Sequence, residues 1–263
     1  MRSTCCDLGV HAAVVAALVI VGVIGVTRAD ATDCPHQDDS IETDRPDVSN
    51  SSLVVPQGSL QIESGIDGNH TDHGRTLDGP QARIRFGAFR CGELLVDLPN
   101  YSQSFAGRGG TSSSPVVISI KRQLFEHATA FSASATVGVG LPNTSAPPAA
   151  GGYSPYAQLP WSRALSEEWS LSGMVTVTWA THKEAVVEPT FVLGREFGRR
   201  SELFIETISD YARHQRAVHT LDGGGGLRIT PKQQVDFHIG MSLSPDSPRR
   251  YVGVGYSVRF DRR

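Results

Sequence analysis

Apolar and polar residues alternate along most of the chain, and the alternation is clearest at its C-terminus. Apolar side chains occupy every second position of two runs there, 235–241 and 252–260. Because successive side chains of a β-strand point to opposite faces, each run has one apolar face and one small or charged face. A soluble sandwich gives this alternation too. A membrane barrel, however, must keep it to the end of the chain, because its last strand pairs with its first and leaves no open edge in lipid. The pattern closes on the aromatic Phe260, which favours the barrel.

The same period predicts an all-β fold, a single antiparallel transmembrane β-barrel of about twelve strands. An even number of this size is typical of single-chain membrane barrels. The expected strands are 59–67, 81–87, 93–98, 116–124, 131–141, 156–163, 169–179, 186–195, 202–209, 219–229, 235–242 and 251–260.

The strand from Phe131 has the cleanest pattern and fixes the expected facing. We expect its apolar set to contact lipid and its polar set to line a wet interior, where an arginine at Thr136 would be tolerated. The apolar set is Phe131, Ala133, Ala135, Val137 and Val139, and the polar set is Ser132, Ser134 and Thr136.

Connections alternate between short and long, as in outer-membrane barrels. Long polar loops are expected at 68–80, 100–114, 142–154, 210–218 and 244–250, with short turns between them and one brief exception at 182–184. Pro160 and Pro189 fall inside expected strands, where proline removes a ladder donor. Each is therefore expected to mark a bulge or a wrongly drawn strand.

The N-terminus has the features of a targeting segment. Arg2 precedes an apolar run at 12–26, and Ala29-Asp30-Ala31 supplies a small-x-small cleavage pattern. The run is shorter than the roughly 20 residues that a spanning helix needs, so a signal peptide at 1–31 is favoured over an uncleaved anchor. A polar, proline-containing periplasmic lead-in would follow at 32–57, and the barrel would occupy 58–263. Cleavage would leave Cys34 and Cys91, either paired in an oxidising compartment or as two free thiols.

Charge and motifs narrow the class of function. With 24 basic and 27 acidic residues the net charge is −3, so no basic field suggests a nucleic-acid partner. We find no cofactor motif, no catalytic constellation and no metal site, because His70 and His73 lack a third ligand nearby. A phospholipase-like barrel enzyme is the enzymatic alternative. It would need a Ser–His pair on a lipid face that is almost entirely apolar.

The inward positions of the expected strands are rich in charge. They form either a lumen that selects solutes or a set of ion pairs that fills a narrow, closed barrel. The residues expected to line this lumen are Gln61, Glu63, Arg83, Arg85, Lys121, Glu188, Glu206, Arg228, Asp236, His238 and Arg259.

Two N-terminal motifs carry a family resemblance. Thr43-Asp44-Arg45-Pro46-Asp47, followed by V-V-P-x-G-x-L-Q-I-E at 54–63, resembles the start of the transporter-like outer-membrane barrels grouped as the "MetA pathway of phenol degradation" family. The segments 156–161, 169–173, 230–236 and 255–260 also match that family's habits, so the resemblance covers nearly the whole mature chain. The tail Asp261-Arg262-Arg263 departs from the usual terminal aromatic.

The resemblance implies an outer-membrane location in a Gram-negative-type envelope. The implied partners are the lipid bilayer, the outer-membrane assembly machinery and small-molecule solutes, aromatic or otherwise hydrophobic ones among them. It also favours a structural latch formed by Thr43, Asp44, Arg45, Pro46 and Asp47, with Arg45 paired to a lumen carboxylate. The alternative is an Asx-type turn that caps the first strand.

Two functions follow from these observations. The first is a passive channel with a polar lumen. The second is a non-conducting barrel that serves as a membrane anchor or surface interaction protein.

Overall fold

The computed structural model describes residues 34–72, 74–105, 110–126, 131–142, 152–179, 185–245 and 249–262. The predicted signal peptide lies outside these ranges. The strands are β1 (Leu60–Thr71), β2 (Gly74–Gly79), β3 (Arg83–Phe89), β4 (Gly92–Asp97), β5 (Tyr101–Ser104), β6 (Gly110–Ser113), β7 (Val117–Glu126), β8 (Phe131–Gly140), β9 (Ser154–Ala164), β10 (Trp169–Trp179), β11 (Ala185–Phe197), β12 (Ser201–Ala212), β13 (Val218–Thr230), β14 (Gln233–Ser242) and β15 (Arg249–Phe260). Within these ranges, no helix has the length and hydrophobicity to cross a bilayer.

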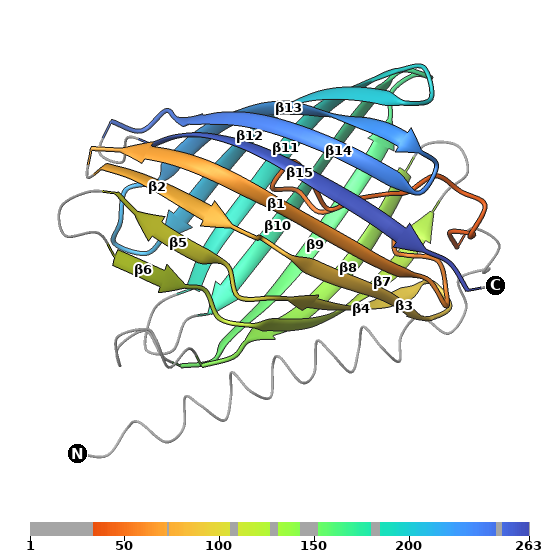
Figure 1. Ribbon diagram of the computed structural model, residues 1–263, viewed down its shortest axis with the longest axis horizontal. Helices are drawn as coiled ribbons and strands as arrows, with labels where there is room; N and C mark the ends of the chain where they lie inside the picture. Colours follow the sequence, from red (N-terminus) through yellow and green to blue (C-terminus); the bar gives the residue numbers. More distant parts are fainter. Residues whose placement is uncertain are drawn as a thin grey trace. The chain divides into compact units, whose positions relative to one another are not determined.

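The sheet closes on itself through its first and last strands (Figure 1). β1 and β15 pair antiparallel from Leu60 opposite Phe260 to Thr71 opposite Arg249. All other neighbouring strands also pair antiparallel, in the order β15-β14-β13-β12-β11-β10-β9-β8-β7-β4-β3-β1. The predicted twelve-stranded barrel is confirmed, with an aromatic residue at the end of the closing strand.

Three of the twelve strands of the barrel each consist of two labelled segments separated by a proline, so the fifteen labels describe twelve strands. Pro80 separates β2 from β3, Pro99 separates β4 from β5, and Pro115 separates β6 from β7. Proline has no N–H to donate to the ladder. Bonds from Leu98 N to Ala82 O (2.8 Å) and from Ser114 N to Asn100 O (2.8 Å) keep the interrupted strands side by side. The breaks therefore form a row across one part of the wall.

The loops predicted at 68–80 and 100–114 are largely strand, so these two predictions are wrong. β1 runs to Thr71 and β2 begins at Gly74, while β5 and β6 occupy much of the second range. Their residues are polar, and they pair through backbone bonds that a hydrophobic period does not report. The brief connection predicted at 182–184 lies in a range that the structure leaves undescribed.

The connections set the orientation of the barrel. At one end lie Leu60, Phe260 and the strand ends that flank the sequence stretches 90–91, 127–130, 165–168, 198–200 and 231–232. At the other end lie the strand ends that flank 72–73, 105–109, 141–153, 180–184, 213–217 and 243–248. Since outer-membrane barrels have short periplasmic turns and longer extracellular loops, the end with Leu60 and Phe260 is periplasmic.

Pro160 and Pro189 lie within β9 and β11, and neither marks a bulge. The β8–β9 pairing passes from Ala133 opposite Trp161 to Thr136 opposite Gln158, with equal spacing on both strands. The β11–β12 pairing passes the second proline in the same way. The missing donor thus leaves a gap in the ladder without a change of register, contrary to the prediction.

The two sets of side chains on β8 face inward and outward as predicted. Ser134 and Thr136 are buried, whereas Phe131 is exposed on the outer surface. Thr136 is only 2% exposed and pairs with Lys121, so an arginine at this position would have no room. The expectation that it would be tolerated there is wrong, because the interior beside β8 is packed.

Aromatic side chains gather on the outer face near the periplasmic end. Trp161 lies between Phe131 and Phe191, with both ring centroids 6.4 Å away. Such a girdle is typical of a barrel at a membrane interface.

Cys34 and Cys91 form a disulfide, which settles the alternative left open by the sequence. It ties the beginning of the described chain to the periplasmic turn between β3 and β4.

Candidate functional site

Residues 41–56, which we call the lumen segment, pass through the interior of the barrel before β1 begins. Ile41, Ser52, Val54 and Val55 are almost fully buried. The segment has no strand or helix of its own, so its backbone groups must find partners on the barrel wall. The lumen wall and this segment together form the candidate site.

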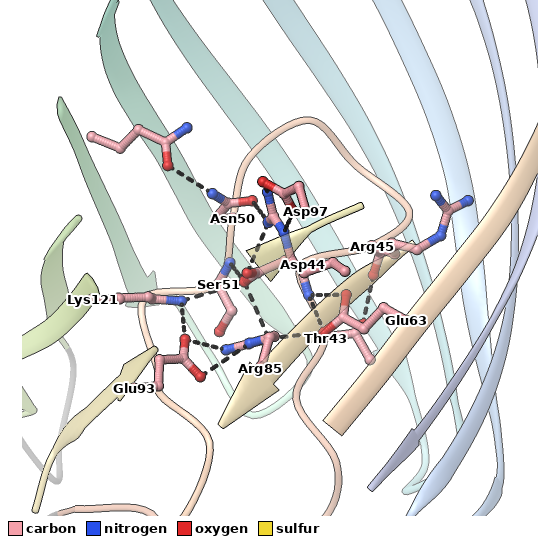
Figure 2. Close-up of polar contacts among 12 residues, drawn as sticks. Thr43, Asp44, Arg45, Asn50, Ser51, Glu63, Arg85, Glu93, Asp97 and Lys121 are labelled. Atoms are coloured by element: carbon pink, nitrogen blue, oxygen red, sulfur yellow. Dashed lines mark hydrogen bonds and ion pairs between the residues drawn. The ribbon is translucent and has the colours of Figure 1, made fainter. Parts of the chain in front are cut away.

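Asp44 is the centre of the contacts between the lumen segment and β1, β3 and β7 (Figure 2). Its carboxylate lies 3.0 Å from Arg83 Nη1, 3.3 Å from Arg85 Nη1 and 3.3 Å from Lys121 Nζ. Its backbone N–H donates to Glu63 Oε2 at 3.0 Å. One buried carboxylate therefore compensates three cations that come from two different strands.

Arg85 links the lumen segment to two wall carboxylates. It forms ion pairs with Glu63 (3.0 Å) and Glu93 (2.8 Å), and it donates to the carbonyls of Glu42 and Leu53, both at 3.2 Å. The side chain is completely buried. Because a buried charge is stable only when it is paired and hydrogen-bonded, this arrangement holds the segment and the wall in one geometry.

A second set of contacts joins the lumen segment to β12, on the side of the barrel opposite β3. The Glu206 carboxylate on β12 accepts bonds from the backbone N–H groups of Val48 (2.8 Å) and Ser49 (3.0 Å) and from Ser49 Oγ (2.8 Å). The lumen segment thus spans the interior, since Asp44 is held by β1, β3 and β7 and Ser49 by β12.

Arg45 lies in a notch formed by two glycines. Gly65 on β1 and Gly255 on β15 are directly opposite each other, and a Cβ on either would overlap the Arg45 side chain. From this notch the Arg45 guanidinium contacts Asp236 at 3.3 Å and donates to Gln81 Oε1 at 2.8 Å. The close approach requires positions without side chains, which glycine provides.

His238 on β14 contacts both Pro46 of the lumen segment and Asp67 of the wall. Its Nδ1 lies 2.8 Å from the Pro46 carbonyl oxygen, and its Nε2 lies 3.1 Å from Asp67 Oδ1. A proton on Nδ1 is needed to donate to the carbonyl, so the ring orientation fixes Pro46 beside β14.

The periplasmic end of the barrel holds the residues just before the lumen segment. Arg259 donates to the carbonyls of Gln37 (2.8 Å), Asp39 (2.7 Å) and Ser40 (3.2 Å). Its Nε also donates to Asp261 at 3.0 Å. Burial raises the pKa of the Asp261 carboxyl, but hydrogen bonds from Lys232, Ser59 and Arg259 outweigh burial and hold that pKa below its usual range. Asp261 is therefore ionised at neutral pH and keeps Arg259 in place.

The sequence-predicted residues fall into groups. Gln61, Glu63, Arg83, Arg85 and Lys121 surround Asp44 or its neighbours, Glu206 binds Ser49, and Asp236, His238 and Arg259 contact other parts of the N-terminal chain. Arg228 lies 3.6 Å from Glu42 and 3.8 Å from Glu202. Glu188 faces the lumen from β11, and no contact with the lumen segment is found for it among the described residues.

Of the latch motif, Asp44, Arg45 and Pro46 contact the wall as just described. Thr43 Oγ1 accepts a bond from Gln234 Nε2 at 3.0 Å and donates to the Arg45 carbonyl. Asp47 borders both lumen cavities.

Sequence reasoning missed Glu93, Asp67 and Asp222 as lumen residues. Glu93 is fully buried and pairs with Arg85, and Asp67 and Asp222 flank His238. The sequence did contain a signal for the inward position of Glu93, because Glu93 alternates with the lipid-facing Leu94.

Two cavities lie on either side of the lumen segment. One, of about 310 Å³, reaches the periplasmic ends of the strands at Ser132, Arg195 and Glu202. The other, of about 340 Å³, is lined by Leu98 and Asn100, which lie midway along the wall between β4 and β5. Arg45, Pro46, Asp47 and Asn50 border both. The segment therefore lies between two cavities of one lumen. Among the residues that the structure describes, no group of His, Cys, Asp or Glu is arranged to hold a metal ion.

Gly87 allows the end of the lumen segment to lie against β3. A Cβ at this position would overlap the carbonyl oxygen of Pro56, and a backbone atom cannot rotate away. We expect Gly87→Ala to lower the free energy of unfolding by about 1–3 kcal/mol, the usual cost of overpacking. Denaturant titration of the folded barrel measures the change. Gly110→Ala is the control, because a Cβ there meets no atom within 4 Å. Equal stability of the two variants would contradict the close contact.

Comparisons with known proteins agree with this architecture. The model of the family described as "Putative MetA-pathway of phenol degradation" matches residues 43–260. The COG4313 outer membrane channel from Pseudomonas putida F1 is similar with a TM-score of 0.62 and 12% identity, over 87% of this chain and 100% of that one. The NanC porin is similar with a TM-score of 0.52 and 6% identity, over 74% of this chain and 98% of that one. The KdgM porin is similar with a TM-score of 0.50 and 13% identity, over 74% of this chain and 98% of that one. No curated protein sequence matches the chain. At these identities the solved structures show a shared fold, that of outer-membrane channels.

Proposed function

Because the chain belongs to this family and has the fold of an outer-membrane channel, we propose that it is a passive channel for small solutes. The observation that carries the proposal is the pair of cavities beside the lumen segment, each of which is lined in part by polar side chains. Side chains that line the two cavities include Ser132, Ser172, Asn100 and Asp97. A barrel that served only as an anchor would need no such cavities.

The charges of the wall favour small neutral or cationic polar solutes. On β11 to β14 the inward positions carry Glu188, Glu202, Glu206, Asp222 and Asp236, whereas Arg228 is the single arginine that those strands place inward in their described part. Rings of carboxylates line cation-selective pores, because they replace part of the hydration shell and repel anions. Apolar residues such as Leu53, Trp161 and Leu98 also line the two cavities, so an aromatic or hydrophobic solute, which the sequence resemblance suggested, would find contacts there too.

The lumen segment would close the resting channel. It is held by ion pairs and hydrogen bonds to the wall, and its buried apolar residues are few. Its movement would therefore exchange protein contacts for contacts with water rather than expose a large core.

Electrical recording in planar bilayers tests the proposal. We expect the purified, folded protein to give a small conductance and, in a KCl gradient, a reversal potential shifted toward that of K⁺. A reversal potential shifted toward Cl⁻ would contradict the role of the carboxylates. No conductance from the wild type or from any variant that loosens the lumen segment would contradict the channel itself.

The second candidate is a closed barrel that acts as an anchor or surface interaction protein. The interlocked Asp44, Arg85 and Glu93 contacts favour it, because they bridge the lumen segment and the wall through buried ion pairs. The conductance of a variant that loses contacts between the lumen segment and the wall, such as Asp44→Ala, distinguishes the two functions.

The remaining assignments stay predictions. They are the signal peptide at 1–31, the latch role of residues 43–47 and the use of the outer-membrane assembly machinery. Mass spectrometry of the mature N-terminus tests the first. The lead-in at 32–57 was expected in the periplasm, but its residues 41–56 lie inside the barrel.

A further inference from the structure

Three basic side chains form a row on the outer face of the barrel. Arg75 on β2 is directly opposite His70 on β1, and His70 is directly opposite Arg250 on β15. All three side chains are exposed. In the described part of the chain, none of them has an ion pair or a side-chain hydrogen bond. Adjacent strands are about 4.8 Å apart, so the row spans about 10 Å.

The row lies at the extracellular edge of the lipid-facing band. On β15 the outward positions from Phe260 back to Val252 are apolar or aromatic, and Arg250 is the first charged one. On β2 the next outward position below Arg75 is Leu77. Charged side chains are tolerated at this depth, where the headgroups of the outer leaflet begin.

An apolar groove of about 560 Å³ begins at this row and continues into the lipid-facing band. His70 and Arg250 line its upper end, and Ile205, Ile239, Met241 and Val252 line the rest. The groove exists because Gly68 and Gly223 point outward without side chains. Gly68 lies between Leu77 and Val252, and Gly223 lies between Ile205 and Ile239.

This combination fits one class of molecule. Guanidinium groups bind phosphate through charge-assisted hydrogen bonds, and an apolar groove gains free energy by covering an acyl chain. A single molecule must present both features at the extracellular edge of an outer membrane. The phosphorylated, multiply acylated glycolipid of the outer leaflet, lipid A, does so.

We propose that Arg75, His70 and Arg250 bind a phosphate of lipid A, with one of its acyl chains in the groove over Gly68 and Gly223. The site is on the outside of the barrel and does not depend on conduction through the lumen. A second copy of the chain is a poorer occupant. Two barrels related by an axis along the membrane normal would bring their basic rows together at the same depth, and like charges repel.

Native mass spectrometry of the detergent-solubilised full-length protein tests the proposal with defined lipids. The probes are bis-phosphorylated lipid A, phosphatidylglycerol and phosphatidylethanolamine, each added at equal concentration. We expect lipid A to be retained most strongly, and the double variant Arg75→Gln/Arg250→Gln to bind it about tenfold more weakly. Gly68→Leu should also weaken binding, because a Cβ at Gly68 meets only the Val252 carbonyl oxygen, at 4.0 Å, and the larger side chain would fill the groove without straining the strand.

Arg163→Gln is the matched control. Arg163 is an exposed residue of β9 at the periplasmic edge, so its loss should leave lipid A binding unchanged. A change in gel mobility when the sample is heated confirms that every variant was folded before heating. Equal retention of lipid A by the wild type and the double variant would overturn the proposal. Equal retention of lipid A and phosphatidylglycerol would also overturn it, by showing a site for any anionic lipid.

Discussion

Asp44→Ala is expected to loosen the lumen segment and raise the conductance of the barrel severalfold. The variant removes the carboxylate that Arg83, Arg85 and Lys121 share, at a position whose side chain is 1% exposed. Removal of one partner from a buried ion pair typically costs about 3–5 kcal/mol, because the remaining charge stays buried and unpaired. The same variant also loses the bond that Ser51 N–H donates to Asp44 Oδ1 at 3.0 Å. Segment and wall should therefore separate more often.

The measurement combines single-channel recording with denaturant unfolding of the same preparation. Asp38→Ala is the control, since Asp38 belongs to the same N-terminal stretch but is exposed to solvent. It should leave both conductance and stability unchanged. If Asp44→Ala unfolds at the wild-type denaturant concentration and conducts like the wild type, the Asp44 contacts do not hold the segment. If it is destabilised but remains closed, the anchor function gains support.

The second large effect is expected from an arginine placed on the lipid-facing side of β10. Val175 points outward, is 40% exposed and lies between Trp169 and Trp179, the aromatic residues at the two ends of the strand. Val175→Arg should lower the free energy of unfolding by roughly 2–4 kcal/mol, the cost of an arginine near the bilayer midplane. Ser172→Arg should have a much smaller effect, because Ser172 faces the periplasmic-side cavity and the new side chain can reach water.

Folding titrations of the two variants into lipid vesicles compare them directly. Because neighbouring positions of one strand alternate in facing, a one-residue error of register would exchange the two outcomes. Equal destabilisation, or a larger loss at Ser172, would show that β10 does not face the membrane as described.

Much of the architecture was determined by the sequence alone, because the period of a strand is a local property. The alternation along 131–139 and 235–260 indicated which side chains face lipid, and Phe260 indicated where the closing strand ends. The same alternation placed Glu63, Arg85 and Lys121 on the inward face. The family motif at 43–47 marked the residues that contact the wall, although it did not identify their partners.

Only the tertiary structure decided which charges meet. Asp44 reaches Lys121, and Ser49 reaches Glu206, across long separations in the chain, and these contacts depend on the register and closure of the whole sheet. The pairing of Cys34 with Cys91 likewise joins residues with a sequence separation of 57. The polar strands β2, β5 and β6 carry little hydrophobic period, so their backbone pairing could not be read from residue types. The external groove has the same origin, because Gly68 and Gly223 come to lie in one row, separated by Val252 and Ile239, only when the first strand pairs with the last.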